Sequence, residues 1–257
     1  MPRRAADPTG YSAGPRFLAP FAMPLPRLVL LPGLACDDAL FRDQRPALAA
    51  LGDVRVADVH TRFDALPEMA TALLAEEDGE LALAGCSMGG MLALEIHRQA
   101  PQRLRGLALL GTTARPDTPE LIALRRWACD EFAQGRMDEV LRANVMFAFA
   151  PAHAEDRALV DDYLAMMRRA GAKKLIRQNQ AVMARPDYRP LLAGIACPSL
   201  VVGGEADSLT PPECARELAA GIGARARLQL LPECGHMLTW EAPEAVTALL
   251  AEWWRSL

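Results

Sequence analysis

Lysine and closely spaced cysteine pairs are scarce in this sequence. Of its 28 basic residues only Lys173 and Lys174 are lysines, a bias that reflects genome composition better than it indicates a partner. The six cysteines include no Cys-x-x-Cys pair, the spacing expected of zinc sites and redox motifs. We therefore expect no metal, no cofactor and a reducing cytoplasmic compartment.

Long apolar runs are missing as well. The first residues, MPRRAADPTGYSAGPRFLAPFAMPLPR, are basic but lack the roughly 7 to 15 residue apolar core of a secretory signal. No later segment offers about 18 uninterrupted apolar residues, the length of a membrane span. The net charge of −4 gives no general attraction to nucleic acid or anionic lipid. We expect a soluble monomer or homodimer without nucleic-acid or membrane partners.

The chain of 257 residues is ordinary in composition, with 51% hydrophobic and 23% charged residues. Residues 1–24 are interrupted by too many prolines for a helix or a central strand, so we expect an N-terminal tail, with the folded part beginning near Met23. The remainder is long enough for one large α/β core.

Short apolar runs alternate with helical patterns along most of the chain. Buried strands are predicted at 28–31, 54–59, 81–84, 107–110, 199–203 and 228–231, and helices at 38–51, 66–76, 212–221 and 243–254. The alternation leaves little room for hairpins, which predicts a mostly parallel sheet with helices on both faces. Ligands of such sheets bind beyond the carboxyl ends of the strands.

The alternation stops between residues 114 and 194. This segment reads as successive helices at 119–132, 137–147, 154–169 and 173–183, broken at Gly171 and Pro186. We expect a helical insertion, a cap, between two parts of the core, 25–113 and 195–257. Apolar residues of the insertion would line a pocket beneath it, and Trp127, Phe147 and Met183 are candidates for substrate binding.

The segment ELALAGCSMGG, residues 80–90, organises the rest. A short buried strand changes abruptly into a helical pattern at Ser87, and Gly85, Gly89 and Gly90 surround the serine. The Gly-x-Ser-x-Gly pattern is typical of a nucleophile elbow, although an ordinary strand-to-helix turn also uses glycine and serine.

An activated serine needs a base and an acid on neighbouring loops. Asp207 follows the predicted strand 199–203, and His236 follows the strand 228–231. Glu205 is the alternative acid. Three other histidines compete with His236: His97 within the predicted elbow helix, His153 in the insertion, and His60, which also ends a strand.

The segments PGLACDD, GCSMGG, GGEADSLTPPE and CGHMLTWEAP, in this order between Leu28 and Trp254, resemble those of α/β-hydrolase-fold serine hydrolases with a helical cap. The resemblance implies that Ser87, Asp207 and His236 are catalytic, and that the N–H groups of Leu34 and Met88 form the oxyanion hole. Pro32-Gly33 stands where many relatives have His-Gly.

These residues predict hydrolysis of small to medium, largely apolar carboxylic esters through an acyl-enzyme. A small molecule is then the substrate. Two alternatives stay open: cleavage of carbon–carbon bonds or elimination of pyruvate by the same triad, and a non-catalytic ligand-binding protein on this fold.

Overall fold

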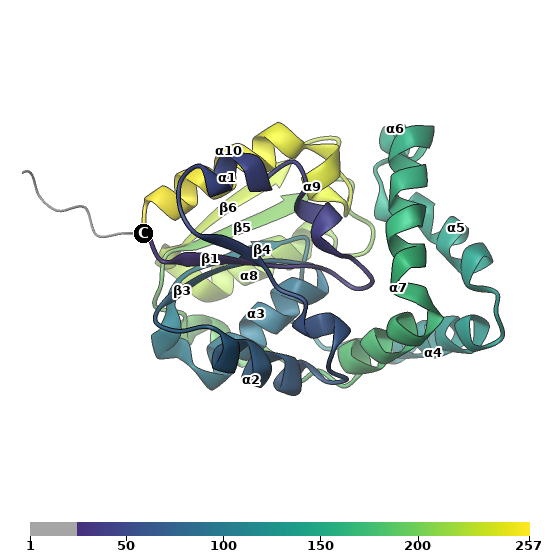
Figure 1. The fold of residues 1–257 in the computed structure, drawn as a ribbon, viewed down its shortest axis with the longest axis horizontal. Coiled ribbons are helices and arrows are strands. Elements are labelled where there is room, and N and C mark those ends of the chain that lie inside the picture. Colours follow the sequence, from purple (N-terminus) through teal and green to yellow (C-terminus); the bar gives the residue numbers. More distant parts are fainter. Residues whose placement is uncertain (1–24) are drawn as a thin grey trace, which may run out of the picture.

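The centre of the molecule is a parallel β-sheet (Figure 1). The computed structural model describes residues 25–257, and the expected tail at 1–24 lies outside them. Within the described residues the strand order is β2-β1-β3-β4-β5-β6, and every neighbouring pair is parallel. The strands are β1 (Arg27–Leu31), β2 (Val54–Val56), β3 (Leu81–Cys86), β4 (Leu104–Leu110), β5 (Ser199–Gly204) and β6 (Ala226–Leu231). The predicted α/β class is confirmed.

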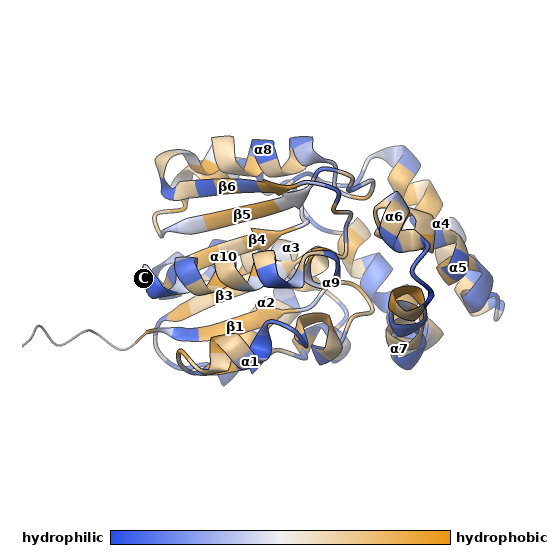
Figure 2. Cartoon of the chain, turned by 90° about the horizontal axis from the view of Figure 1, so that it is seen from above, coloured by the Kyte–Doolittle hydropathy of each residue, from blue (hydrophilic) through white to orange (hydrophobic). Residues whose placement is uncertain are grey.

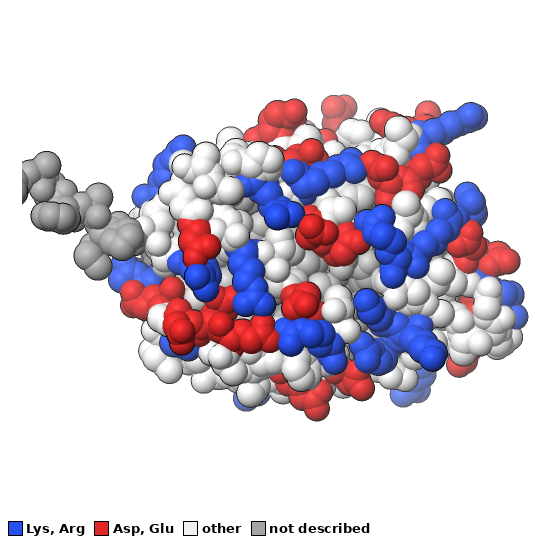
Figure 3. All heavy atoms as spheres, viewed as in Figure 1, with Lys and Arg blue, Asp and Glu red and all other residues white. Residues whose placement is uncertain are grey.

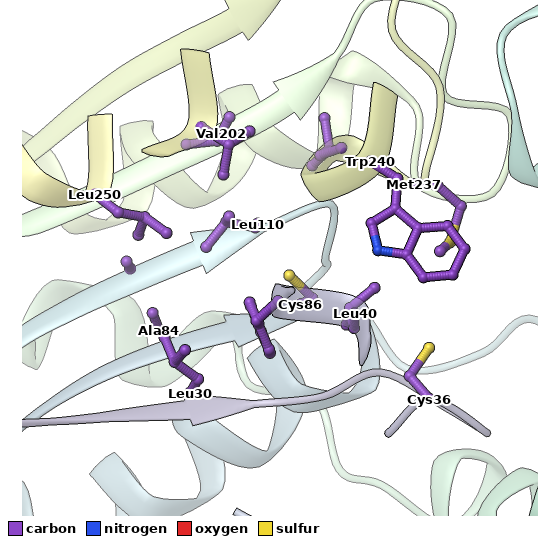
Figure 4. Close-up of a cluster of buried hydrophobic side chains, with 14 of the residues drawn as sticks. Leu30, Cys36, Leu40, Ala84, Cys86, Leu110, Val202, Met237, Trp240 and Leu250 are labelled. Carbon is purple, nitrogen blue, oxygen red and sulfur yellow. The ribbon is translucent and has the colours of Figure 1, made fainter. Parts of the chain in front are cut away.

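Apart from Arg27, Arg105 and Ser199, the residues of the central strands are apolar, because both faces of the sheet are covered. Successive side chains point to opposite faces, so β1, β3, β4 and β5 each contribute to two separate cores. One core contains Leu28, Leu30, Ala82, Ala84, Ala108, Leu110, Leu200 and Val202, and part of it appears in Figure 4. The other contains Val29, Leu31, Leu81, Leu83, Leu107, Leu109 and Val201.

Helices cover each face of the sheet (Figure 1). Helices α1 (Arg45–Ala49) and α10 (Pro243–Arg255) lie on one face, and α2 (Leu66–Glu76), α3 (Met88–Gln99) and α8 (Pro212–Ile222) on the other. The predicted helix at 38–51 is shorter than expected. Asp37 caps a 3-10 turn at Asp38–Phe41 instead, and α1 begins only at Arg45. The strand predicted at 54–59 likewise ends at Val56, before a 3-10 turn at Val59–Thr61.

Helices α4 (Pro119–Ala133), α5 (Met137–Ala148), α6 (Pro151–Ala154) and α7 (Arg157–Met183) lie between β4 and β5 in the sequence. In space they gather beyond the carboxyl ends of the strands (Figures 1 and 2). Helix α7 consists of two helical parts that meet at Gly171, whose φ of +75° and ψ of 160° are not helical, so the predicted break is confirmed, although the first part begins at Arg157 rather than at 154. At the base of this segment the Tyr188 N–H donates to the Ala114 carbonyl at 2.9 Å, which brings its two ends together.

Ion pairs connect α7 to the sheet-bearing part of the chain. They join residues more than 100 positions apart: Arg42 with Asp162, Arg169 with Asp37, and Arg177 with Asp64. Exposed pairs of this kind contribute at most about 1 kcal/mol each, so they orient α7 more than they stabilise the fold. Figure 3 shows acidic and basic side chains interspersed over one face of the molecule. Every helix in residues 25–257 is too short or too polar to cross a lipid bilayer.

Candidate active site

Ser87 stands at the turn from β3 into α3 with a strained backbone. Its φ of +52° and ψ of −117° lie outside the regions that residues with a Cβ normally adopt. The turn is possible only because its neighbours are glycines. A Cβ on Gly85 would lie 2.3 Å from the Gly89 carbonyl oxygen, and one on Gly89 would lie 2.0 Å from the Leu31 oxygen. The strand-to-helix crossing is therefore too close for any side chain at these two positions.

The structure brings Ser87, His236 and Asp207 together in one chain of hydrogen bonds. His236 follows β6 and Asp207 follows β5, so both reach the same edge of the sheet as the serine. His236 Nε2 lies 2.9 Å from Ser87 Oγ, and Nδ1 lies 2.9 Å from Asp207 Oδ2. With Nδ1–H donating to the carboxylate, Nε2 is free to accept the serine proton.

Asp207 is held by its own loop. Oδ1 accepts the backbone N–H groups of Leu209 and Thr210, at 2.9 and 2.8 Å, and Oδ2 accepts the Thr210 hydroxyl at 2.7 Å. Burial raises the pKa of Asp207, but the neighbouring His236 and the bonds from Thr210 outweigh burial, so the pKa lies below its usual range. The carboxylate therefore remains ionised and fixes the tautomer of His236.

A second carboxylate, Glu241, shapes the loop that carries His236. It is buried and accepts the backbone N–H groups of Ala150, Gly235 and Met237 at 2.8 to 3.0 Å. Gly235 and Met237 flank His236 directly, so Glu241 positions the histidine from both sides. Of these three bonds, only the one to Ala150 joins residues far apart, 91 positions; the bonds to Gly235 and Met237 are local, and no motif of the sequence indicated them.

Burial lowers the pKa of His236, whereas the charge and hydrogen bond of Asp207, with a smaller contribution from Glu241, raise it. The pKa therefore lies above the ordinary value of 6.5. An unperturbed histidine pKa, which the sequence alone would suggest, does not hold in this site, because Asp207 contacts the ring and the charge of Glu241 lies nearby.

The loop after β1 faces the serine. Neither the Leu34 N–H nor the Met88 N–H donates a hydrogen bond to any group within residues 25–257. Next to Leu34, Ala35 has a φ of +60°, and its N–H donates to Gln178 Oε1 at 2.7 Å. Gln178, on α7, is buried and was not predicted, since 143 residues separate it from Ala35. Together with the Arg169–Asp37 ion pair, Gln178 ties the loop after β1 to α7.

The competing residues lie elsewhere. His60 is buried beneath the loop after β1, where Nε2 is 2.8 Å from the Cys36 carbonyl oxygen. His97 is buried within α3, and His153 Nδ1 lies 2.9 Å from Glu241. Glu205 is exposed and has no side-chain contact with His236 among the described residues. Of the candidate bases and acids, the structure places only His236 and Asp207 beside Ser87.

A cavity of about 420 Å³ opens above Ser87 and His236. Its walls are mainly apolar and come from the loops at the strand ends and from helices α4, α5 and α7. The helical lining follows one stripe on each helix, at the three- or four-residue spacing of a single helical face. The stripes are Leu121, Leu124, Arg125, Ala128 and Phe132 on α4, Val140, Leu141, Asn144 and Ala148 on α5, and Tyr163, Met167, Leu175, Asn179 and Val182 on α7.

The three substrate-binding candidates chosen from the sequence lie outside this lining. Trp127 and Phe147 are 49% and 46% exposed. Met183 follows the lining residue Val182 directly, and one residue along a helix turns the side chain by about 100°. The apolar composition of the helices indicated a pocket but not which face of each helix borders it.

Three thiols, those of Cys36, Cys86 and Cys214, also line the cavity. Burial, with a smaller contribution from Asp37, raises the pKa of Cys36 to about 12, and burial raises the pKa of Cys86 still further. Both are therefore protonated at neutral pH and act as small apolar groups. Residues 25–257 contain no group of three or more His, Cys, Asp or Glu side chains arranged to bind a metal ion.

Several known proteins are similar to this chain over most of its length. The chain is 30% identical over 236 residues to the dihydrolipoyllysine-residue acetyltransferase component of an acetoin cleaving system from Pseudomonas putida, covering 85% of this chain and 60% of that protein. It is 26% identical over 241 residues to a pimeloyl-[acyl-carrier protein] methyl ester esterase from Neisseria meningitidis, covering 87% and 91% of the two chains.

The structure resembles that of a thermophilic esterase from Thermogutta terrifontis, with a TM-score of 0.80, 25% identity, and coverage of 90% of this chain and 89% of the other. Residues 52–243 match the model of the family described as serine aminopeptidase, S33. This match spans most of the chain, including Ser87, Asp207 and His236. The chain therefore belongs to this family of serine hydrolases with the α/β-hydrolase fold.

Proposed function

We propose that the protein hydrolyses carboxylic esters of small to medium, largely apolar substrates through an acyl-enzyme on Ser87. One observation carries the proposal: the two 2.9 Å contacts that link Ser87 to His236 and His236 to Asp207 lie at an apolar cavity. The esterases from Neisseria meningitidis and Thermogutta terrifontis, to which the chain is similar, support an ester as the substrate.

In the first half of the reaction Ser87 Oγ attacks the ester carbonyl while His236 Nε2 takes the hydroxyl proton. Asp207 stabilises the imidazolium that forms. The N–H groups of Leu34 and Met88 donate to the developing oxyanion, which is consistent with neither having an acceptor within residues 25–257. His236 then returns its proton to the departing alcohol, and the acyl group stays on Ser87.

In the second half His236 removes a proton from a water molecule that attacks the acyl-enzyme. The tetrahedral intermediate collapses, the carboxylic acid leaves, and His236 restores the proton to Ser87 Oγ. Gln178 and Glu241 take no part in these transfers. They hold the loop after β1 and the loop of His236 at the distances that the transfers require.

The helical segment 114–194 acts in this proposal as a cap over a core formed by 25–113 and 195–257. Its helices provide much of the apolar cavity wall, whereas the loops of the core provide Ser87, Asp207 and His236. The core residues would determine the chemistry and the cap residues the size and shape of the substrate.

A fluorophosphonate probe tests the proposal directly. The wild-type protein is expected to form a covalent adduct at Ser87, detected by mass spectrometry of the peptide, because only an activated serine attacks such a probe at a useful rate. Ser87→Ala is the control and should remain unlabelled. A wild-type protein that stays unlabelled would reject the proposal and favour a binding protein.

The pH dependence of ester hydrolysis follows from the raised pKa of His236. The base must be neutral to accept the serine proton, so kcat/KM is low where the imidazole is protonated and rises as pH passes through its pKa. Because the pKa lies above 6.5, we expect the midpoint of this rise above pH 6.5. Initial rates between pH 5 and pH 9 would measure it, with a midpoint at or below about pH 6 contradicting the prediction.

The dependence of activity on acyl-chain length reports the size of the cavity, independently of the pKa of His236. Each added methylene should improve transition-state binding by up to about 0.8 kcal/mol until the cavity is full, after which activity should fall. A volume near 420 Å³ is at the small end of ligand pockets, so we expect the best p-nitrophenyl esters among short and medium acyl chains, roughly C2 to C8. Activity that continues to rise to about C16 would show that the cavity does not limit the acyl chain.

A further inference from the structure

A charged cluster lies in the part of the cavity wall that the helical segment provides. Arg125 on α4 donates through Nε to Asp117 Oδ2 at 2.7 Å and through Nη1 to Asn179 Oδ1 at 2.9 Å. Arg185 Nη2 forms an ion pair with the other oxygen of Asp117 at 2.8 Å. All four side chains line the cavity. Two guanidinium groups thus share one carboxylate, and the cluster carries a net positive charge.

Arg185 holds this cluster in place, and its guanidinium has no nitrogen left for a ligand. Its side chain is 2% exposed, and Nε and Nη1 donate to the carbonyl oxygens of Arg115 and Val182 at 3.0 and 2.8 Å. Asp117 is equally buried. Each nitrogen of Arg185 therefore has an oxygen within 3.0 Å, and the Arg185–Asp117 pair forms a rigid support rather than a ligand-binding group.

Arg125 differs from Arg185 because one end of its guanidinium is unused. The side chain is 28% exposed, and Nη2 donates to no group within residues 25–257. The side chain of Arg125 is also fixed, because Asp117 accepts from Nε and Asn179 accepts from Nη1. Asn179 is itself held by its amide, which donates to the Leu175 carbonyl at 2.8 Å. The guanidinium is thus preorganised, with free N–H donors available to a molecule in the cavity.

Within the described lining, Arg125 has no carboxylate partner other than Asp117. Among the described lining residues the ionised side chains are Asp117 and three arginines, and the third arginine, Arg115, is paired with Glu217 at the surface. Because the remaining wall is mainly apolar, solvent screens the charge weakly. The charge is also felt at the base, since Arg125, after burial of the ring, is a second influence that lowers the pKa of His236.

We propose that Arg125 binds a free carboxylate of the substrate, so that the preferred esters carry a second, ionised carboxyl group. Guanidinium groups bind carboxylates through short, charge-assisted hydrogen bonds, and this one is already oriented for the purpose. That the bound molecule is an ester rests on the proposed ester hydrolysis, whereas the binding of a carboxylate by Arg125 does not depend on it. The ligand class is therefore a half-ester of a dicarboxylic acid.

Binding can be measured without turnover in a Ser87→Ala background. Titration calorimetry with monomethyl adipate, which is anionic, and dimethyl adipate, which is neutral, should show tighter binding of the half-ester. Adding Arg125→Gln should weaken binding of the half-ester by about 10- to 100-fold, the range expected for loss of a hydrogen bond to a charged group. It should weaken binding of the diester less, so the ratio of the two affinities falls.

Arg126→Gln is the matched control. Arg126 is the next residue of α4, is exposed, and does not line the cavity, so its loss removes the same formal charge from the chain without touching the cluster. The affinity ratio should stay at its starting value. Arg125→Lys, which keeps the charge but not the planar fork, should retain part of the selectivity and also serves if Arg125→Gln lowers the thermal unfolding temperature.

Two results would overturn the inference: equal or tighter binding of the neutral diester by the Ser87→Ala protein, or an equal loss of affinity for both esters on Arg125→Gln. Wild-type turnover separates this failure from failure of the proposed function. Hydrolysis of both esters without charge selectivity would reject the carboxylate site alone. Selective binding without hydrolysis of either ester would reject ester hydrolysis and leave the carboxylate site standing.

Discussion

Replacing Ser87 by alanine is expected to lower kcat/KM for p-nitrophenyl esters by about 10³-fold or more, with the fold intact. The loss is large because the nucleophile is removed, and His236 and Asp207 then have no hydroxyl to activate. Alanine keeps the Cβ, so the strained backbone at φ +52° remains as it is in the wild-type protein. Initial rates, with circular dichroism and thermal unfolding of the same samples, would measure the two effects separately.

His236→Ala provides the companion measurement. Because the groups act as a unit, the double variant should be scarcely less active than either single variant. Losses that multiply in the double variant would show that Ser87 and His236 act independently. Near wild-type rates in either single variant would remove that residue from the mechanism.

Asp207→Asn is expected to reduce kcat by about 10³- to 10⁴-fold while leaving the hydrogen-bonded loop largely in place. An amide can still accept the backbone N–H groups of Leu209 and Thr210, but it no longer stabilises the imidazolium or fixes Nδ1–H on His236. The proton would then be free to occupy Nε2, where it blocks acceptance of the serine proton. Steady-state kinetics would measure the loss.

Glu205→Gln is the matched control for this substitution. It makes the same carboxylate-to-amide change two residues away, on an exposed side chain without contact to His236. We expect turnover within about twofold of wild type, since surface changes of this kind perturb a protein little. A larger loss in Glu205→Gln than in Asp207→Asn would transfer the role of the acid to Glu205.

The local patterns of the sequence were sufficient to predict the sheet and the residues placed on its loops. Apolar runs identify strands covered on both faces, and the strand ends then locate Ser87, Asp207 and His236 at a common edge. The spacing of glycines around Ser87 gave the turn, because the close crossing at Gly85 and Gly89 excludes any side chain. These features depend on contacts between neighbouring elements.

The features that were missed depend on contacts across long separations. Gln178 reaches Ala35, and Glu241 reaches Ala150, only after the helical segment has folded over the strand ends. Which face of a helix borders the cavity is equally a tertiary property, which is why Trp127, Phe147 and Met183 were preferred to the actual lining residues. Neither periodicity nor composition contains this information.

The joining of both ends of the helical segment at the Tyr188 to Ala114 hydrogen bond has an evolutionary consequence. A segment that leaves and re-enters the core at one point can be lengthened, shortened or exchanged while β4 and β5 keep their register. If the segment acts as the proposed cap, mutations in it would change substrate selectivity while leaving Ser87, Asp207 and His236 in place. Related proteins could then diverge in substrate preference through substitutions, insertions and deletions in residues 115–187 while retaining Ser87, Asp207 and His236.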